Sequence, residues 1–466
     1  TPQAIFTRLE NSLRLLTGGA RDLPARQQTM RAAISWSYDL LEEGEKRLLS
    51  RLAVFSGGMT IEAIEEVCGT DGEPGVEVLD VITSLVDKSL LVQKEQADGE
   101  SRFRLLELVR EYAMERLEQS GEEQKFKERH AAFYLALAEK AQPELLASGA
   151  AEWLNRLEEE HDNLRSALRW LLERDAESGL RLVGAARPFW ERRGHLTEGR
   201  AWLEGALKKG VGAKAQLRAK ALIGLGQLAW QQGDLEAAHS SYEESLRNSQ
   251  EAGDKRLIAM SSRGLGTVAF IQGNLAAARP LLEEALAVCR EINDTRGVAT
   301  TLTTLGELAR SEGKLRTARS LYEESVGLHR QLGNQYGECA NLLNLGAVAC
   351  LEEDLEAAHA CHLEAIVIAE KMADRVQVAY SLNGFGALLV MRGEMRRAAR
   401  LFGAAAQLHE SIGYELEPQD RGFRNRYESQ ARAALGNELY VATEAEGRTL
   451  RMKEAIELAL ESSSPA

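Results

Sequence analysis

The chain has 466 residues and a formal net charge of −14, and this acidic balance disfavours general binding to nucleic acid or to anionic membranes. Hydrophobic residues make up 44% of it, yet no apolar run approaches the roughly 20 residues that a membrane-spanning helix needs. The five cysteines form no CxxC pair, which indicates neither a disulfide framework nor a zinc site and predicts a reducing, cytoplasmic location.

Residues 28–120 are predicted to form a small domain of helices followed by a β-hairpin. Helical patterns cover about 29–41, 43–54, 61–67 and 76–87. Two β-prone runs, 90–94 and 102–105, flank an Ala97-Asp98-Gly99 turn, which is typical of a hairpin. This order of elements is typical of a winged helix.

The helix at 76–87 occupies the place of a DNA-recognition helix, but its charges are acidic. It carries Glu77, Asp80 and Asp87, and the nearby cation is Lys88. Because a helix that reads a DNA groove needs Arg or Lys for phosphates and bases, we expect a structural hinge module with no direct binding of nucleic acid.

Residues 121–218 are predicted to form a helical arm. Within the arm, residues 178–210 look like a degenerate copy of the repeat that follows, because Gly194-His195-Leu196 echoes Gly233-Asp234-Leu235.

Residues 219–418 repeat with a period of 40. One series of glycines has this spacing: Gly226, Gly266, Gly306, Gly346 and Gly386. An aromatic slot with the same spacing holds Tyr242, Leu282, Tyr322, His362 and Phe402. The pattern resembles the tetratricopeptide repeat, so we expect five helix pairs, about 18 residues per helix, stacked into a superhelix.

Glycine and asparagine predict where the repeat helices end, because both tolerate the left-handed cap. The first helices should end at Gly233, Gly273, Gly313 and Gly393, with Glu353 as the exception in this series. The second helices should end at Gly253, Asn293, Gly333 and Gly413. The residues expected to cap the next first helix are Asp254, Asp294, Asn334 and Asp374.

After residue 418 the repeat decays, and residues 419–466 are predicted to hold capping helices at 424–436 and 451–461. The predicted fold is therefore all-α with one small β-hairpin, a winged helix followed by a tetratricopeptide-like α-solenoid superhelix.

The concave face of the array is the candidate binding site. The first helix of each pair is expected to line it with a ligand or partner groove of Trp230, Arg263, Phe270, Glu307, Arg310, Tyr380 and Asn383. Apolar groups with a few convergent polar ones suit a peptide, a small molecule or a protein partner. The alternative, that neighbouring repeats or a partner domain cover this face, is equally open.

No residue set predicts catalysis or a metal site. The string from Gly306 to Lys314 has the wrong spacing for a P-loop, and Leu315 stands where Mg²⁺ chemistry needs Ser or Thr. His359, Cys361 and His362 share one helical turn, but His362 fills the aromatic slot, so packing explains it better than a ligand role.

Several segments together resemble the bacterial STAND signalling ATPases. They are Leu23–Arg31, Ser35–Leu41, Arg51–Phe55, Leu85–Leu90 and Glu159–Leu172. The segment Arg432–Gly436 resembles the stretch that precedes a LuxR-type DNA-binding domain. The resemblance implies a piece of a large ATP-dependent LuxR-type regulator, with residues 1–27 as the linker from a nucleotide-binding lobe. It also implies that ATP or ADP and Mg²⁺ bind only with that lobe, so that this chain has no cofactor of its own.

The resemblance also places contacts to the lobe at Arg26, Glu107 and Arg110. In this class the strand after the hairpin often ends Met-His-Asp-Leu, whose histidine touches the nucleotide. This chain reads Leu105-Leu106-Glu107-Leu108, so leucine stands in place of that histidine.

We therefore expect a non-enzymatic chain that senses a signal and relays it within a STAND-type transcriptional regulator. The alternative is a stand-alone tetratricopeptide scaffold for protein–protein interaction.

Overall fold

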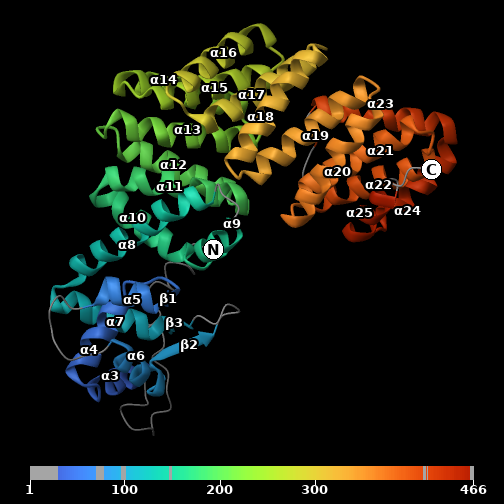
Figure 1. Ribbon diagram of the computed structural model, residues 1–466. Helices are drawn as coiled ribbons and strands as arrows, with labels where there is room; N and C mark the ends of the chain where they lie inside the picture. The colour runs from blue at the N-terminus through green and yellow to red at the C-terminus, as the bar shows by residue number, and fades with distance from the viewer. Residues whose placement is uncertain are drawn as a thin grey trace, which may run out of the picture. The chain divides into compact units, whose positions relative to one another are not determined.

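The structure is a computed structural model that describes residues 30–69, 78–95, 101–145, 150–412, 416 and 418–461 (Figure 1). It forms two compact units, residues 1–224 and 225–466, and the boundary falls inside α13 (Ala215–Gln231). Among the described helices, none has the length and apolar character needed to cross a membrane.

The first unit begins with a winged helix. Its elements are α3 (Met30–Asp39), α4 (Glu43–Leu52), β1 (Gly58–Thr60), α5 (Ile61–Cys68), α6 (Val78–Asp87), β2 (Leu91–Glu95), β3 (Ser101–Leu105) and α7 (Glu107–Ser120). The predicted hairpin is confirmed, since β2 and β3 pair antiparallel with Leu91 opposite Leu105; the Asp-Gly turn lies outside the described residues. The sheet order is β1-β3-β2, and the three-residue β1 was not predicted because it is too short for a periodic signal.

The helices of this domain enclose an apolar core behind the sheet. The Thr60 side chain accepts a hydrogen bond from the Ala63 N–H and so caps α5 at its start. Leu52, Phe55 and Leu85 are fully buried, and α6 packs against both α4 and β2.

The helical arm of the first unit consists of α8 (Glu123–Glu144), α9 (Ala150–Glu159), α10 (His161–Arg174), α11 (Ala176–Arg193) and α12 (Leu196–Lys209). Gly194 separates α11 from α12 with φ 78°, a left-handed conformation that glycine adopts without steric cost. The degenerate repeat predicted at 178–210 is therefore a helix pair.

The repeat array continues from α13 through nine further helices. These are α14 (Leu235–Ala252), α15 (Lys255–Ile271), α16 (Leu275–Glu291), α17 (Thr295–Ser311), α18 (Leu315–Gln331), α19 (Gln335–Leu351), α20 (Leu355–Lys371), α21 (Arg375–Met391) and α22 (Met395–Ser411). The predicted ends are confirmed where they are described: Gly233, Gly273, Gly313 and Gly393 all have positive φ, and so does the exception, Glu353, at 63°. Gly413 lies outside the described residues.

The predicted N-caps are also confirmed. Each capping side chain accepts a hydrogen bond from the backbone N–H three residues later, as Asp254 does from Leu257 and Asp374 does from Gln377.

Close packing explains the paired 40-residue series of glycines and slot residues. A Cβ atom built on Gly306 would lie 2.5 Å from Cε1 of Tyr322, and one on Gly386 would lie 2.6 Å from Cε1 of Phe402. The two helices of each pair can therefore cross closely only because the first helix carries no side chain at this position.

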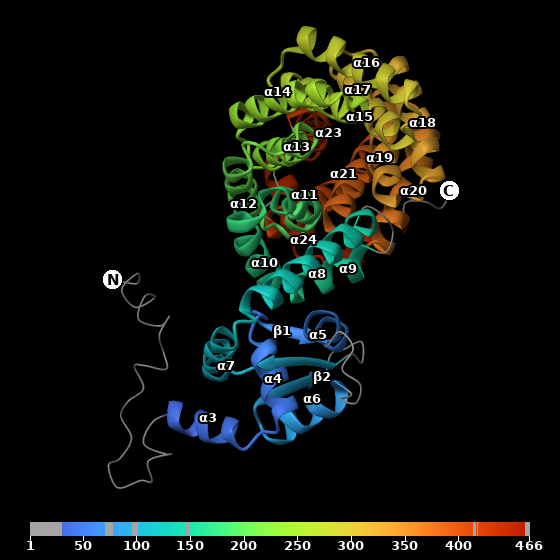
Figure 2. The same ribbon diagram turned by 90° about the vertical axis from the view of Figure 1, so that its left-hand side faces the viewer.

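The chain ends with α23 (Pro418–Leu435), α24 (Asn437–Arg448) and α25 (Met452–Glu461). Two of these match the predicted capping helices, whereas α24 was not predicted. The Tyr427 hydroxyl of α23 donates to the carbonyl of Cys350 in α19 at 2.9 Å. Within the second unit, α23 thus lies against the first helices of the repeats, on the inner side of their curve (Figure 2).

Candidate functional site

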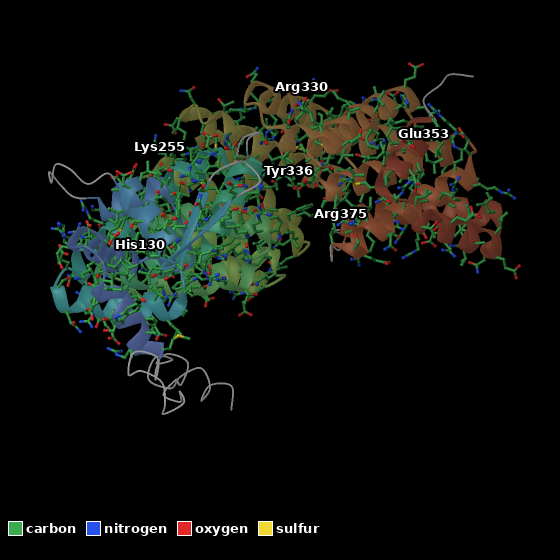
Figure 3. All side chains as sticks on the ribbon, turned by 90° about the horizontal axis from the view of Figure 1, so that it is seen from below. His130, Lys255, Arg330, Tyr336, Glu353 and Arg375 are labelled. Carbon is green, nitrogen blue, oxygen red and sulfur yellow. The ribbon has the colours of Figure 1, made fainter. Side chains whose placement is uncertain are left out.

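A cavity of about 160 Å³ lies on the inner face of the second unit, between the first helices of three repeats and α23. Its lining includes four of the seven predicted groove residues, Glu307, Arg310, Tyr380 and Asn383. Tyr336, labelled in Figure 3, contributes to the same lining. The structure thus gathers these residues from α17, α19 and α21, helices that follow one another at 40-residue intervals.

The centre of the cavity is a buried ion pair. Nη2 of Arg310 donates to Oδ1 of Asp420 at 2.7 Å, and the Arg310 side chain is only 6% exposed. Burial alone would lower the pKa of this guanidinium, but Tyr322, Asp420 and Glu307 raise it well above its ordinary value. Arg310 is therefore a permanent cation that needs an anionic partner at this place.

Three polar atoms of residues that line the cavity have unused hydrogen-bonding capacity. Among the described residues, Oδ1 of Asn383, Nε of Arg310 and Nδ1 of His362 are buried and have no hydrogen-bond partner. A buried polar atom without a partner costs about 1–3 kcal/mol, so the site can gain from a ligand that supplies the missing donor and acceptor.

The concave face along α19 and α21 is covered by the chain itself. Cys350 of α19 and Val390 of α21 are both buried. Phe423 lines the cavity from α23, and Asp420 of α23 supplies the carboxylate on Arg310. One end of the predicted groove thus carries an internal segment, which the sequence did not predict.

The other three predicted groove residues do not line this cavity. Trp230, Arg263 and Phe270 belong to α13 and α15 and are partly exposed. Phe270 packs against a small core around Leu282 and Leu305.

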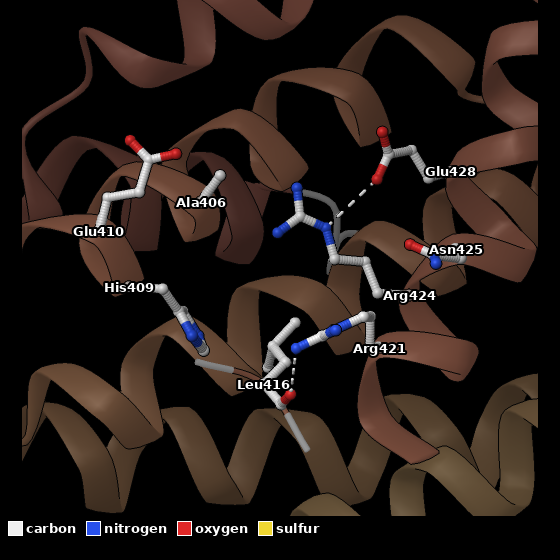
Figure 4. A pocket seen from close by; sticks show the side chains of 8 residues that line it. All are labelled: Ala406, His409, Glu410, Leu416, Arg421, Arg424, Asn425 and Glu428. Atoms are coloured by element: carbon white, nitrogen blue, oxygen red, sulfur yellow. Dashed lines mark hydrogen bonds and ion pairs between the residues drawn. The ribbon is translucent and has the colours of Figure 1, made fainter. Parts of the chain in front are cut away.

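A second, more open hollow of about 280 Å³ lies between α22 and α23 (Figure 4). Its charged side chains are mostly paired. Nε of Arg424 lies 3.3 Å from a carboxylate oxygen of Glu428, and Glu410 pairs with Arg448 of α24 at 2.9 Å.

The residues expected to contact a nucleotide-binding lobe lie at the start of α7. Glu107 and Arg110 pair with each other at 2.7 Å on the surface, and the ion pair with Arg110 lowers the pKa of Glu107. Leu106 is 52% exposed. Arg26 lies outside the described residues.

A buried polar network joins the winged helix to the arm within the first unit, and the sequence did not predict it. The Asn163 side chain at the start of α10 accepts from the Ser56 N–H at 2.8 Å and donates to the Gly58 carbonyl at 2.8 Å. Asn163 also donates to Glu160 at 2.7 Å, and Nη1 of Arg102 from β3 lies 2.5 Å from the same carboxylate. The network is therefore shared by the sheet and α10.

Burial shapes the electrostatics of this network. The Tyr134 hydroxyl of α8 donates to Glu160 at 2.8 Å, so the buried carboxylate has three partners. Burial would lower the pKa of Arg102, but the hydrogen bond and charge of Glu160 raise it. His130, labelled in Figure 3, is fully enclosed nearby, and burial lowers its pKa to about 4. His130 is thus neutral in the folded protein at pH 7.

The charged side chains on α6 and on the two hairpin strands bear on the expectation that this domain does not bind nucleic acid. Lys88 forms an ion pair with Glu45 of α4, while Asp80 and Asp87 of α6 are exposed. The hairpin strands β2 and β3 carry the exposed side chains Lys94 and Arg104.

His362 is fully buried in the aromatic slot of its repeat, as the packing interpretation predicts, and burial lowers its pKa to about 4.

Comparison with protein families supports the two-part architecture. Residues 41–118 match the winged helix-turn-helix domain family. Residues 186–254 and 257–331 match two tetratricopeptide repeat families.

Among curated proteins, an HTH-type transcriptional regulator of Mycobacterium tuberculosis is 43% identical over 211 residues. The match covers 45% of this chain and 23% of the relative, so the chain matches less than a quarter of that protein's length. An uncharacterized M. tuberculosis protein is 38% identical over 123 residues, 26% of this chain and 31% of the relative.

Two solved structures align with much of the chain. A STAND protein with a tetratricopeptide repeat sensor from Pyrococcus horikoshii aligns over 95% of this chain and 72% of its own, with TM-score 0.48 and 18% identity. A Rap protein complexed with competence and sporulation factor aligns over 67% of this chain and 99% of its own, with TM-score 0.43 and 11% identity.

Proposed function

We propose that this chain is the sensing and relay portion of a STAND-type, ATP-dependent transcriptional regulator, and that its signal is an acidic peptide or small acidic ligand. The winged helix, the repeat array and the 43% identity to a transcriptional regulator support the regulatory role. The observation that carries the sensing role is the buried Arg310–Asp420 pair at the cavity.

The ligand chemistry follows from what the cavity offers. Arg310 needs a carboxylate, and in this structure Asp420 supplies it from α23. A ligand carboxylate would replace that of Asp420, and a ligand N–H group would donate to the unpartnered Oδ1 of Asn383. Since ligand sites usually measure about 300–1,000 Å³, a cavity of about 160 Å³ must open by a shift of α23.

The relay part of the proposal rests on the network around Glu160 and Asn163. This network ties α10 of the arm to β1 and β3 of the winged helix through hydrogen bonds of 2.5–2.8 Å. A movement of α10 would therefore move the sheet with it. Glu107 and Arg110 would meet the nucleotide-binding lobe, which would hold ATP or ADP with Mg²⁺; the chain itself would supply no catalytic group, bind no nucleic acid directly and work in the cytoplasm.

Thermal unfolding of the chain with a panel of acidic peptides and carboxylate metabolites tests the sensing role, followed by calorimetry of each ligand that raises Tm. We expect Arg310→Gln and Asn383→Ala to abolish the response. Asp420→Asn should tighten binding about tenfold, because it removes the internal competitor.

Matched controls separate the cavity from the rest of the array. Arg319 forms a similar inter-repeat pair with Glu352 but does not line the cavity, so Arg319→Gln should keep the response. Trp230→Ala should also keep it. A response that survives Arg310→Gln would contradict the site, and binding of folded proteins alone would favour the scaffold alternative.

A further inference from the structure

The structure brings together three metal-ligating side chains in the first unit that no sequence pattern connects. His161 begins α10, Glu158 lies in the last turn of α9, and His195 lies between α11 and α12. One ligand atom from each of the three lies within 4.8 Å of the others. His195 is 37 residues from Glu158 along the chain, which is why the sequence predicted no metal site here.

The distances are close to those of a metal centre. Nε2 of His195 lies 3.2 Å from both carboxylate oxygens of Glu158. In a tetrahedral zinc site, bonds of about 2.1 Å leave neighbouring ligand atoms about 3.4 Å apart. Side-chain movements of about an ångström would therefore bring all three donors onto one ion.

The buried histidine has a nitrogen available for such an ion. His161 is 6% exposed, and its Nε2 makes no hydrogen bond to any described residue, although Oε1 of Glu198 lies 3.4 Å away. Burial lowers the pKa of His161, because the charged imidazolium is disfavoured away from water. Its ring lies 4.6 Å from the ring of His195, centroid to centroid.

The surrounding charges are mixed but allow a divalent cation. Arg165 holds Glu198 through two hydrogen bonds of 2.6 Å, and this pairing lowers the pKa of Glu198 to about 2. Nε of Arg193 lies 3.6 Å from Oε2 of Glu158 and competes with a metal for that carboxylate. Both carboxylate oxygens of Glu198 accept from Arg165, so Glu198 offsets the charge of that cation beside the site.

We propose that Glu158, His161 and His195 form a binding site for Zn²⁺ or a similar divalent transition metal. Two imidazoles and one carboxylate are the ligand set that such borderline metals prefer. Glu158 and His195 are partly exposed and give the ion a path to the site, while His161 closes it from inside. The ion would tie α9 to α10 and to the corner before α12, independently of the ligand site proposed in the repeat array.

Titration of the chelator-treated chain with Co²⁺, followed by visible absorption and by displacement with Zn²⁺, tests this site. We expect one tightly bound ion with the intense absorption of tetrahedral Co²⁺. His195→Ala and Glu158→Gln should each weaken binding about 100-fold, because three protein ligands are the minimum for such a centre. Arg193→Gln should strengthen it, since Glu158 then loses its competing cation.

Two controls keep the result specific. His239 and Glu243 form an exposed pair at 3.8 Å on α14, and no third ligand joins them among the described residues, so His239→Ala should bind Co²⁺ like the unchanged chain. His359→Ala removes the histidine two residues before Cys361 and should also leave Co²⁺ binding unchanged. The proposal is overturned if the chain binds no Co²⁺ more tightly than millimolar, or if His195→Ala, shown to be folded by circular dichroism, binds it unchanged.

Discussion

At the scale of single residues, the junction of winged helix and arm depends on one buried carboxylate. Glu160 is 2% exposed and pairs with Arg102, whose side chain is also enclosed. The adjacent Glu159 pairs with the same arginine at 3.7 Å but is 40% exposed. Substitutions of Glu160 and Glu159 therefore distinguish the effect of a buried charge partner from that of an exposed one.

We expect Glu160→Gln to lower the free energy of unfolding by about 3 kcal/mol, because it leaves the Arg102 charge without its buried partner. Glu159→Gln should cost below about 1 kcal/mol, since exposed ion pairs contribute little. Urea unfolding of both variants, followed by circular dichroism, measures the difference. Equal losses of unfolding free energy in the two variants would show that the buried network does not hold the winged helix on the arm.

His362 makes the stability of the repeat array depend on pH. Burial lowers its folded pKa to about 4, against 6.5 for the free side chain. Between these values the unfolded chain binds a proton that the folded chain does not, so stability falls as the pH falls from 6.5 to 4. His362→Phe should lower the slope of stability against pH by about 1.4 kcal/mol per pH unit, because phenylalanine has no group that binds a proton. Phe402, which fills the same slot in the next repeat, shows that the slot accepts phenylalanine.

Urea unfolding at intervals between pH 4.5 and 7 measures the slope. Tyr322→Phe alters the same slot one repeat earlier without removing a group that titrates in this range, so its slope should match that of the unchanged chain. An identical slope for His362→Phe would show that the imidazole is already protonated in the folded state.

At the scale of helices, the space beside a glycine inside a repeat helix decides whether that position accepts a side chain. Gly306 in α17 faces the Tyr322 ring, whereas a Cβ on Gly327 in α18 would meet nothing within 4 Å. Gly306→Ala should destabilise the chain by about 1–3 kcal/mol through overpacking. Gly327→Ala should stabilise it by about 1 kcal/mol through helix propensity. Thermal unfolding checks both signs, and stabilisation by both variants would refute the packing argument.

The distance along the chain between interacting residues explains what the sequence could predict. Caps such as Asp254 and turns such as Gly233 act within three residues, so the 40-residue period predicts where the repeat helices begin and end. The Arg310–Asp420 pair spans 110 residues and has no local pattern, so the covering of the groove by α23 could not be predicted. The same holds for β1, whose three residues depend on β3 for their pairing.

At the scale of the whole molecule, the two compact units meet within one helix. The boundary follows Gly224 in α13. A Cβ on Gly224 would touch Arg187 and Leu203 of the first unit, while one on Gly226 would touch Tyr242 of the second. The two halves of α13 thus belong to different packing environments, and each unit needs its half to be helical.

This arrangement predicts how the chain can be divided. A fragment of residues 215–466 keeps α13 whole, whereas residues 225–466 retain only its last seven residues, too few to form a stable helix unaided. In the shorter fragment the remaining turns of α13 should therefore unfold and no longer pack on Tyr242. This fragment should melt at least about 4 °C lower, since about 1 kcal/mol shifts Tm by 2–4 °C at this size. Calorimetry of both fragments makes the comparison. Equal melting temperatures would mean that the first half of α13 adds nothing to the stability of the second unit.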